Sequence, residues 1–253
     1  MVWQIFFLLS FLIYKRFFNI INSSNKIIKK IIFSSKNLTN LKLKNKFKLL
    51  KLKNFNIVKC LFCSVVPQTF QLIKKYIKQF YKINCLELKD LNIEKLIKIK
   101  VNKKQIGSDR LANAIAATNN KDNFIILDFG TATTFDVLIK NVYHGGVIAP
   151  GLKLSLNMLI SNASLIPHLN LKKINKVIGS NTVSAVRSGF YWGYVGLINN
   201  IVNLIKKETR KSFKIIITGG FSNLFGTSVY KKKVIINKDI TINGLIKATD
   251  LIK

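Results

Sequence analysis

Carboxylates and glycines are missing from the first third of this chain. The 253 residues contain 10 Asp and Glu against 42 Lys and Arg, yet no carboxylate precedes Glu87 and no glycine precedes Gly107. That region therefore cannot supply a metal-associated carboxylate or a glycine turn around a phosphate. Because acids are so few, each of the three that fall inside the motifs described below is informative: Asp109, Asp128 and Asp136.

Arginine is also scarce. Lysine makes up all the other basic residues, in a chain equally rich in Asn, Ile and Phe, and the four arginines are Arg16, Arg110, Arg187 and Arg210. Lys, Asn, Ile and Phe share A/T-rich codons, so we attribute most of the formal net charge of +32 to nucleotide bias. A nucleic-acid partner for the lysine-rich first third is the alternative, which we do not favour.

Cysteine, with three residues, and histidine, with two, are too sparse for a metal-binding framework. Cys60 and Cys63 have CxxC spacing, but no second pair completes a zinc site, so we expect buried apolar thiols there. His144 and His168 have no spaced partners and are expected to be surface or structural residues. The odd number of cysteines, with Cys85 as the third, and the lack of a dense disulfide framework fit a reducing cytosol. We therefore expect a cytoplasmic protein.

Long apolar runs are absent. Residues 1–14 are apolar apart from Gln4 and Ser10, whereas a helix that spans a bilayer needs about 20 apolar residues. The positive charge of Lys15 and Arg16 follows this run, but a signal peptide carries its charge before the run. We therefore expect a first buried strand and no cleavage, with a membrane-associated segment as the less favoured alternative.

The patterns that are present alternate strands with helices. Residues 17–55 show weak period-two alternation, as in 41–44 and 49–53, which predicts edge strands with a solvated lysine face. Residues 57–64 predict a strand, Pro67 opens a helix with one apolar face, and residues 83–86 predict another strand. This order indicates an α/β fold.

The most informative stretch is residues 123–136. An apolar run ends in Asp128, turns through Gly130 and Thr131, and resumes as a second apolar run after Thr134. This pattern predicts a strand, a tight turn and a second strand. Glycine N–H groups, threonine hydroxyls and a carboxylate can together hold a phosphate chain and its counter-ion, so we interpret the stretch as a phosphate-binding hairpin.

Residues 107–110, Gly-Ser-Asp-Arg, precede an alanine-rich helix. Ser108 is expected to cap that helix, which places Asp109 in its first turn. Asp109 then either only complements the helix dipole, or it takes a proton from a substrate while Arg110 holds an anionic group of that substrate. The tetrapeptide alone leaves both interpretations open.

The second half contains two further glycine-rich segments. Residues 144–151 predict a strand and loop, followed by a helix over 152–160. Residues 214–218 predict a buried strand that ends at Gly219 and Gly220, where a nucleotide can lie against bare backbone.

The longest predicted helix covers residues 182–207. Its apolar side chains step by three and four along one face, and Gly189, Gly193 and Gly196 form a second stripe. Glycine costs about 1 kcal/mol in a helix interior, so we expect another backbone or a ligand to approach this stripe closely.

Together these segments resemble type III pantothenate kinases, members of the acetate and sugar kinase, Hsc70 and actin superfamily. The similar motifs occur in order over roughly residues 57–250: Gly107 to Arg110, residues 128–136, Gly-Gly-x-Ile-x-Pro-Gly at 145–151, Ile-Gly-x-Asn-Thr with Ser-Gly at 178–189, and Thr-Gly-Gly at 218–220. The resemblance implies two ribonuclease-H-like domains with mixed five-stranded sheets, flanking helices and a nucleotide cleft between them. We expect the domains to be residues 1–115 and 116–253.

The resemblance also implies an activity. It is the transfer of the γ-phosphate of ATP to the 4′-hydroxyl of pantothenate, the first step of coenzyme A biosynthesis. Asp109 would be the catalytic base that removes the hydroxyl proton. The implied substrate site consists of Gly107, Ser108, Asp109, Arg110 and Thr182.

For ATP, the resemblance implies contacts with Thr131 and with the glycines Gly130, Gly219 and Gly220, together with Mg²⁺. Asp128 would hold a monovalent cation, K⁺ or NH₄⁺. A homodimer is implied as well, and the glycine-striped helix 182–207 is our candidate interface element.

One family motif has no counterpart. The family opens with a strand that runs into Asp-x-Gly-Asn-Thr, its first phosphate motif, and nothing of this kind occurs in residues 1–14. Lys100 also occupies the position of a tyrosine that the family often carries seven residues before Gly-x-Asp-Arg. The alternative to an active kinase is therefore a catalytically impaired homologue that binds pantothenate or nucleotide without turnover.

Overall fold

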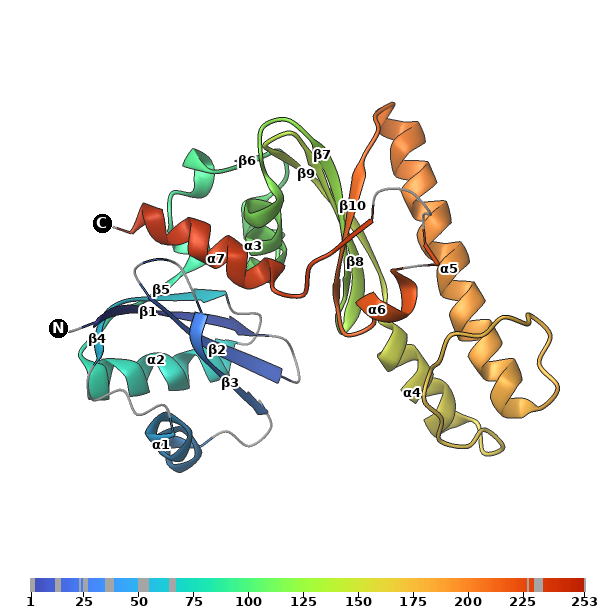
Figure 1. Ribbon diagram of the computed structural model, residues 1–253, viewed down its shortest axis with the longest axis horizontal. Helices are drawn as coiled ribbons and strands as arrows, with labels where there is room; N and C mark the ends of the chain where they lie inside the picture. The colour runs from blue at the N-terminus through green and yellow to red at the C-terminus, as the bar shows by residue number, and fades with distance from the viewer. Residues whose placement is uncertain are drawn as a thin grey trace. The chain divides into compact units, whose positions relative to one another are not determined.

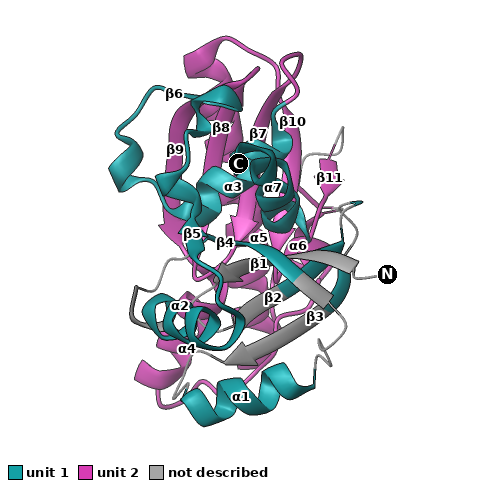
Figure 2. Cartoon of the chain, turned by 90° about the vertical axis from the view of Figure 1, so that its left-hand side faces the viewer, with its two compact units in different colours: residues 1–118, 239–253 teal, residues 119–238 magenta. Residues whose placement is uncertain are grey.

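The computed structural model describes residues 3–11, 15–22, 24, 27–34, 39–49, 55–63, 67–226, 228–229 and 234–252. The chain forms two compact units, residues 1–118 with 239–253 and residues 119–238 (Figure 2). The first limit lies close to the predicted boundary after residue 115. The segment from Asp239 onwards, which the sequence interpretation assigned to the second domain, clusters with the first unit instead.

The first unit contains a mixed five-stranded sheet in the order β3-β2-β1-β4-β5. β1 (Trp3–Phe11), β2 (Lys15–Asn22) and β3 (Ile27–Ser34) are antiparallel, and β4 (Phe55–Cys63) and β5 (Cys85–Glu87) run parallel to β1. The strands predicted within residues 1–14 and 57–64 are confirmed as β1 and β4. The burial of the β1 side chains lies outside what the structure describes.

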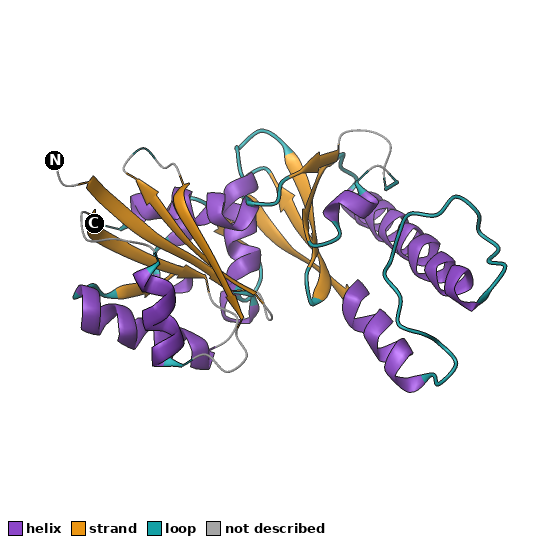
Figure 3. Ribbon diagram, turned by 60° about the horizontal axis from the view of Figure 1, so that its bottom comes forward, coloured by secondary structure: helices purple, strands orange, loops and turns teal. Residues whose placement is uncertain are grey.

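Helices cover both faces of this sheet (Figure 3). On one face, α1 (Asn40–Lys48) and α2 (Pro67–Tyr81) share a core with β2, β4 and β5, in which the rings of Phe47 and Tyr76 lie 5.0 Å apart. On the other face, α3 (Ser108–Ala117) contacts β4 and α7 (Ile240–Ala248) contacts β1 and β4. Short elements join β5 to α3: η1 (Leu88–Asp90), η2 (Ile93–Lys95), β6 (Lys98–Ile99) and η3 (Lys103–Gln105).

The edge strand predicted for residues 41–44 is wrong, because these residues lie in α1. Thr39 caps this helix by accepting a hydrogen bond from the backbone N–H of Lys42 at 3.3 Å. Leu43 and Phe47, four residues apart, are both buried. The run fits helical spacing as well as strand alternation, and packing of Leu43 and Phe47 in the core shared with α2 favours the helix. Residues 50–53 of the second alternating run lie outside the described residues.

α7 packs against α3, and the two helices lie side by side (Figure 1). The Thr241 hydroxyl donates to Asn113 Oδ1 at 2.7 Å. Lys247 Nζ donates to the carbonyl oxygens of Ala116 and Thr118 at 2.9 and 3.0 Å, at the end of α3 where carbonyls lack helical partners. Gly244 lies so close that an added Cβ would stand 1.8 Å from the carbonyl oxygen of Ala112. The 3₁₀ helix η4 (Thr249–Leu251) follows α7.

The second unit repeats the strand order of the first. β7 (Asn123–Phe129), β8 (Ala132–Ile139) and β9 (Val142–Pro150) are antiparallel, and β10 (Lys214–Gly219) and β11 (Val234–Ile236) run parallel to β7. These five strands belong to a six-stranded sheet, in which their order is β9-β8-β7-β10-β11. The order and directions match those of β3-β2-β1-β4-β5. The prediction of two similar α/β units is confirmed, and the β7–β8 hairpin is the topological counterpart of β1–β2.

Three helices pack on one face of the second sheet: α4 (Leu152–Asn162), α5 (Thr182–Thr209) and α6 (Ser222–Phe225). The rings of Tyr191 and Tyr194 on α5, the long orange helix of Figure 1, lie 5.6 and 6.3 Å from that of Phe225. The helices predicted for residues 152–160 and 182–207 are confirmed as α4 and α5. Among the described residues, no helix combines the length and apolarity needed to cross a membrane.

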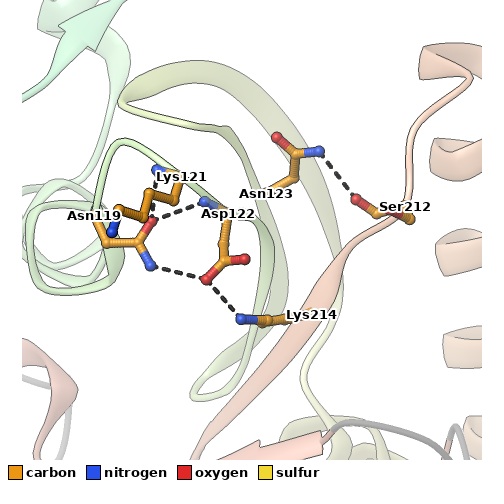
Figure 4. A network of polar contacts seen from close by, with 6 residues as sticks. All are labelled: Asn119, Lys121, Asp122, Asn123, Ser212 and Lys214. Carbon is orange, nitrogen blue, oxygen red and sulfur yellow. Dashed lines mark hydrogen bonds and ion pairs between the residues drawn. The ribbon is translucent and has the colours of Figure 1, made fainter.

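A polar network joins the starts of β7 and β10 (Figure 4). Asp122 Oδ2 accepts from Lys214 Nζ at 2.6 Å and from Asn119 Nδ2 at 2.9 Å, and these bonds lower the pKa of Asp122. Asn123 Nδ2 donates to the carbonyl of Ser212 at 3.0 Å. Because β7 and β10 are parallel, these contacts support the register that pairs Asp128 with Thr218 at the other end of the strands.

Candidate functional site

The predicted hairpin is confirmed, and Gly130 and Thr131 form its tight turn between β7 and β8. The Gly130 N–H donates to the carbonyl of Ala132 at 3.1 Å and so closes the turn. This N–H is therefore engaged within the turn, contrary to the expectation that it faces a phosphate. The carbonyl of Thr131 lies against Gly151, where a Cβ would stand 1.7 Å from it. The Thr131 side chain, which is half-buried, is a polar group of this turn that a phosphate could contact.

β10 brings Gly219 and Gly220 to the same turn. The Gly220 N–H donates to the carbonyl of Phe129 at 3.1 Å. Gly219 has a φ of +85°, and a Cβ there would stand 2.5 Å from the Phe129 carbonyl oxygen and 2.6 Å from Asp128 Oδ1. Glycine is needed at 219 both for this conformation and for this close approach. The carboxylate of Asp128 thus lies beside bare backbone.

Two oxygens of the β7 end lie close to Gly219. They are Asp128 Oδ1 and the Phe129 carbonyl oxygen. Within the described ranges, no three His, Cys, Asp or Glu side chains come together in a group that could hold a metal ion. One carboxylate with neutral oxygens fits a monovalent cation better than an all-protein divalent site, which usually draws on several carboxylates.

Asp109 stands in the first turn of α3, as predicted, but Ser108 does not cap the helix. The N-cap is Gly107, and Ser108 is already the first helical residue. Asp109 Oδ1 accepts a hydrogen bond from the Arg110 N–H at 2.9 Å and lies over Gly107, where a Cβ would stand 2.5 Å from it. Burial raises the pKa of Asp109, whereas the N–H and the charge of Arg110 and the charge of Lys89 act to lower it.

The Ser108 hydroxyl donates instead to Oε1 of Glu87, in a short hydrogen bond. Glu87 ends β5, and Cys63, at the end of β4, is buried nearby. Burial raises the pKa of the Cys63 thiol, and the carboxylates of Asp109 and Glu87 raise it further. Cys63 and Glu87 were missed in the sequence. The available signal was that Glu87 is the first acid of the chain and follows a predicted strand, since functional groups gather at the carboxyl ends of parallel strands.

Thr182 is the first residue of α5 and is exposed. The turn before it is well fixed, because Asn181 Oδ1 accepts from the Ser184 N–H at 2.9 Å and Ser184 Oγ accepts from the Asn181 N–H at 3.0 Å. Gly179 packs against the same turn of helix. No contact among the described residues joins Thr182 to the cluster around Asp128.

The glycine stripe of α5 is not covered by the described part of the chain. Gly189, Gly193 and Gly196 are exposed, and no described atom outside the helix lies within 4 Å of a Cβ at any of them. The close approach predicted for this stripe is therefore not made within those residues. Beside it lies an apolar hollow of about 290 Å³, lined by Leu159, Val186, Gly189, Phe190, Gly193, Tyr194 and Leu197.

The three cysteines are free and buried, which confirms the expectation of apolar thiols. Cys60 and Cys85 are register partners on β4 and β5. His168 is exposed, as expected of a surface residue, and lines a hollow of about 400 Å³ together with Lys172 and Arg187.

Comparison with known proteins identifies close relatives. A family model described as type III pantothenate kinase matches residues 19–204. The type III pantothenate kinase of Pelagibacter ubique (strain HTCC1062) is 68% identical over 234 residues, 92% of this chain and 94% of that protein. The type III pantothenate kinase of Paramagnetospirillum magneticum (strain ATCC 700264 / AMB-1) is 37% identical over 201 residues, which cover 78% of this chain and 76% of that protein.

Among solved structures, the ethanolamine utilization protein EutJ from Carboxydothermus hydrogenoformans has a similar fold. The TM-score is 0.55 at 10% sequence identity, with 95% of this chain and 88% of that chain covered. At this identity the likeness speaks for the fold alone.

Proposed function

This chain belongs to the type III pantothenate kinase family, and we propose that it transfers the γ-phosphate of ATP to the 4′-hydroxyl of pantothenate, the first step of coenzyme A biosynthesis. The observation that carries this proposal is the family match over residues 19–204. That range contains both the start of α3, with its partly buried carboxylate, and the β7–β8 hairpin.

We assign the role of catalytic base to Asp109. The hydroxyl of pantothenate must lose its proton as its oxygen attacks the γ-phosphorus, and a carboxylate with a raised pKa takes up a proton more readily than an exposed one. Arg110 supplies a guanidinium for an anionic group of the substrate. Gly107 and Ser108 complete the substrate side of this turn, and Thr182 contributes a hydroxyl from α5.

We assign ATP binding to the β7–β8 turn and the end of β10. Thr131 offers its hydroxyl, and the bare backbone of Gly130, Gly219 and Gly220 leaves room for the nucleotide. Asp128 is the proposed ligand of K⁺ or NH₄⁺, supported by the oxygens that gather beside Gly219. Such a cation supplies positive charge near the phosphates when bound. Mg²⁺ would be held mainly by the phosphates, as is usual for this ion.

The catalytically impaired homologue is the second candidate, and the first hairpin favours it. β1–β2 is the topological counterpart of β7–β8, yet residues 3–22 contain no carboxylate and no glycine, and Lys15 and Arg16 stand where β2 begins. This hairpin therefore offers no counterpart of Asp128 or Gly130. A kinase of this chain would rely on the second hairpin for its cation and its phosphate turn.

Purified protein given ATP, Mg²⁺, K⁺ and pantothenate is expected to form phosphopantothenate, measured by mass spectrometry. Calorimetry with each substrate separates the two candidates. Binding of pantothenate or ATP without product under any cation condition would establish the impaired homologue and reject the kinase. Rescue of a pantothenate-kinase-deficient strain would instead eliminate the impaired homologue.

We further propose a cytoplasmic homodimer with α5 in its interface. The bare glycine stripe, the apolar hollow beside it and the exposed apolar residues of α4 support this: Leu154 is 44% exposed and Met158 56%. A reducing cytoplasm would keep the three buried thiols free.

Gly193→Glu is expected to convert the dimer to a monomer, because it places a charge in the centre of this apolar surface. Light scattering coupled to size-exclusion chromatography measures the mass. Ser212→Glu, which adds the same charge at an exposed site two residues before β10, is the matched control and should stay dimeric. A wild-type monomer, or a Gly193→Glu dimer, would refute the assigned interface.

A further inference from the structure

We propose that Glu87 is a positioning residue for the catalytic base. Its carboxylate holds the first turn of α3, and with it Asp109, in the orientation used for proton removal. The inference rests on the role proposed for Asp109 above. It assigns a function to the first acidic residue of the chain, which none of the motifs includes.

The contact that carries the inference is the short hydrogen bond from the Ser108 hydroxyl to Oε1 of Glu87. Ser108 is 2% exposed, so its hydroxyl is shielded from competing water. Glu87 is itself fixed in the sheet, since it ends β5 and pairs in register with Phe62 of β4. The bond therefore ties the residue next to Asp109 to a rigid element.

α3 needs such a tie because its N-cap supplies none. The N-caps of α1 and α5 are Thr39 and Asn181, whose side chains accept hydrogen bonds from backbone N–H groups of the first turn. The N-cap of α3 is Gly107, which has no side chain to do this, and the Arg110 N–H of the first turn donates to Asp109 itself. The Glu87–Ser108 bond joins two side chains and satisfies no backbone N–H, but it ties the first turn of α3 to the sheet.

The opposite end of α3 is fixed by α7, through the bonds of Lys247 and Thr241 and the close approach of Gly244. Because that end is held, loss of the Glu87 bond is expected to displace the first turn of the helix. Asp109 lies in this turn, and a displacement of about 1 Å at a reacting group costs about 10²-fold in rate. Loss of the Glu87 tie is therefore expected to lower kcat more than substrate binding.

Cys63 makes this arrangement observable. Its thiol is fully buried at the end of β4, near the carboxylates of both Asp109 and Glu87. The cluster is not a metal site, because the described residues hold no group of three such side chains that could bind an ion. Opening of the first turn of α3 would expose Cys63, whereas Cys60 and Cys85 lie in the core that the sheet shares with α2.

The first test compares Glu87→Ala with Glu87→Gln. Glu87→Ala is expected to lower kcat by about 10- to 100-fold, with the KM for ATP changed less than about threefold. Glu87→Gln keeps an oxygen acceptor for Ser108 and should recover kcat to within about threefold of wild type. Glu94→Gln, at an exposed acid of η2, is the control. An unchanged kcat in Glu87→Ala, or no rescue by Gln, would overturn the proposal.

The second test does not depend on turnover. The carboxylate of Glu87 raises the pKa of Cys63, so the comparison is made with Glu87→Gln, which removes the same charge but keeps the oxygen acceptor for Ser108. Iodoacetamide labelling followed by peptide mapping is expected to show Cys63 reacting about 10- to 100-fold faster in Glu87→Ala than in Glu87→Gln, with Cys60 and Cys85 unchanged. Equal exposure of all three thiols would show general loosening and overturn the positioning role. If the wild-type protein makes no phosphopantothenate, the proposed function fails, but selective Cys63 labelling still supports the tie and unchanged labelling still refutes it.

Discussion

Asp109→Asn is expected to abolish most of the turnover of pantothenate, with a fall in kcat of about 10² to 10⁴, the range that a general base contributes. Asparagine keeps the size of the side chain and an oxygen that can accept from the Arg110 N–H, but it cannot take the hydroxyl proton. Pantothenate binding, measured by calorimetry, should change only a few-fold, because Arg110 and the backbone of the turn remain. Asp90→Asn, at an exposed acid of η1, is the matched control and should leave kcat unchanged.

The same substitution has an expected effect on stability, which separates loss of the base from loss of the fold. Burial raises the pKa of Asp109 in the folded state above its value in the unfolded chain. Ionisation of this group therefore costs stability as the pH rises through the window from about 4 to the raised pKa. Asparagine cannot ionise, so the variant should be at least as stable as wild type at pH 7.

Well below a pH of about 4 the carboxyl is protonated in both states, and the stability difference between wild type and Asp109→Asn should shrink towards zero. Urea unfolding at the two pH values measures it. A variant that is less stable than wild type at pH 7 would show that Asp109 supports the fold, and its lost turnover would no longer identify a base.

Local patterns predicted the elements whose partners are close in sequence. The β7–β8 hairpin was predicted from an apolar run, Asp128, Gly130 and a second apolar run, all within one short stretch of sequence. α5 follows from its spacing of apolar residues and the Asn181 start. In each case the residues that decide the structure lie within a few positions of one another.

The predictions that were wrong depended on partners far away in the sequence. Ser108 was expected to cap α3 because serine before a helix usually does so, but Glu87 on β5 accepts its hydroxyl hydrogen bond instead. Leu43 and Phe47 follow both a strand and a helix pattern, and their burial in the core shared with α2 decides for the helix. The return of α7 to the first unit depends on Gly244 meeting Ala112, which no local pattern contains.

Part of the candidate site could be predicted from local patterns, but the contacts that depend on the folded backbone could not. Asp128, Gly219 and Gly220 were each visible as a residue at the end of a predicted strand, and their meeting follows from the pairing of β7 with β10. The engagement of the Gly130 N–H inside its own turn was not visible, because it depends on the backbone geometry at Ala132.

Gly219→Ala is expected to damage both the stability of the second unit and the binding of ATP. Gly219 has a φ of +85°, which costs an alanine about 1–2 kcal/mol, and the new methyl group would overlap the Phe129 carbonyl oxygen at 2.5 Å and Asp128 Oδ1 at 2.6 Å. Relief requires β10 to move from β7 or Asp128 to turn away from its present position. Urea unfolding should show a loss of about 2–5 kcal/mol, since overpacking adds about 1–3 kcal/mol to the conformational cost.

Gly220→Ala is the control for stability, because no atom of the described residues lies within 4 Å of a Cβ at this neighbouring glycine, and its unfolding midpoint should stay close to that of wild type. Calorimetry at fixed K⁺ should show at least about tenfold weaker ATP binding to Gly219→Ala, as expected when Asp128 is displaced by about 1 Å. Lost stability with unchanged ATP affinity would mean that Asp128 does not act on the nucleotide. Because the first hairpin has no carboxylate to take its place, that result would favour the impaired homologue.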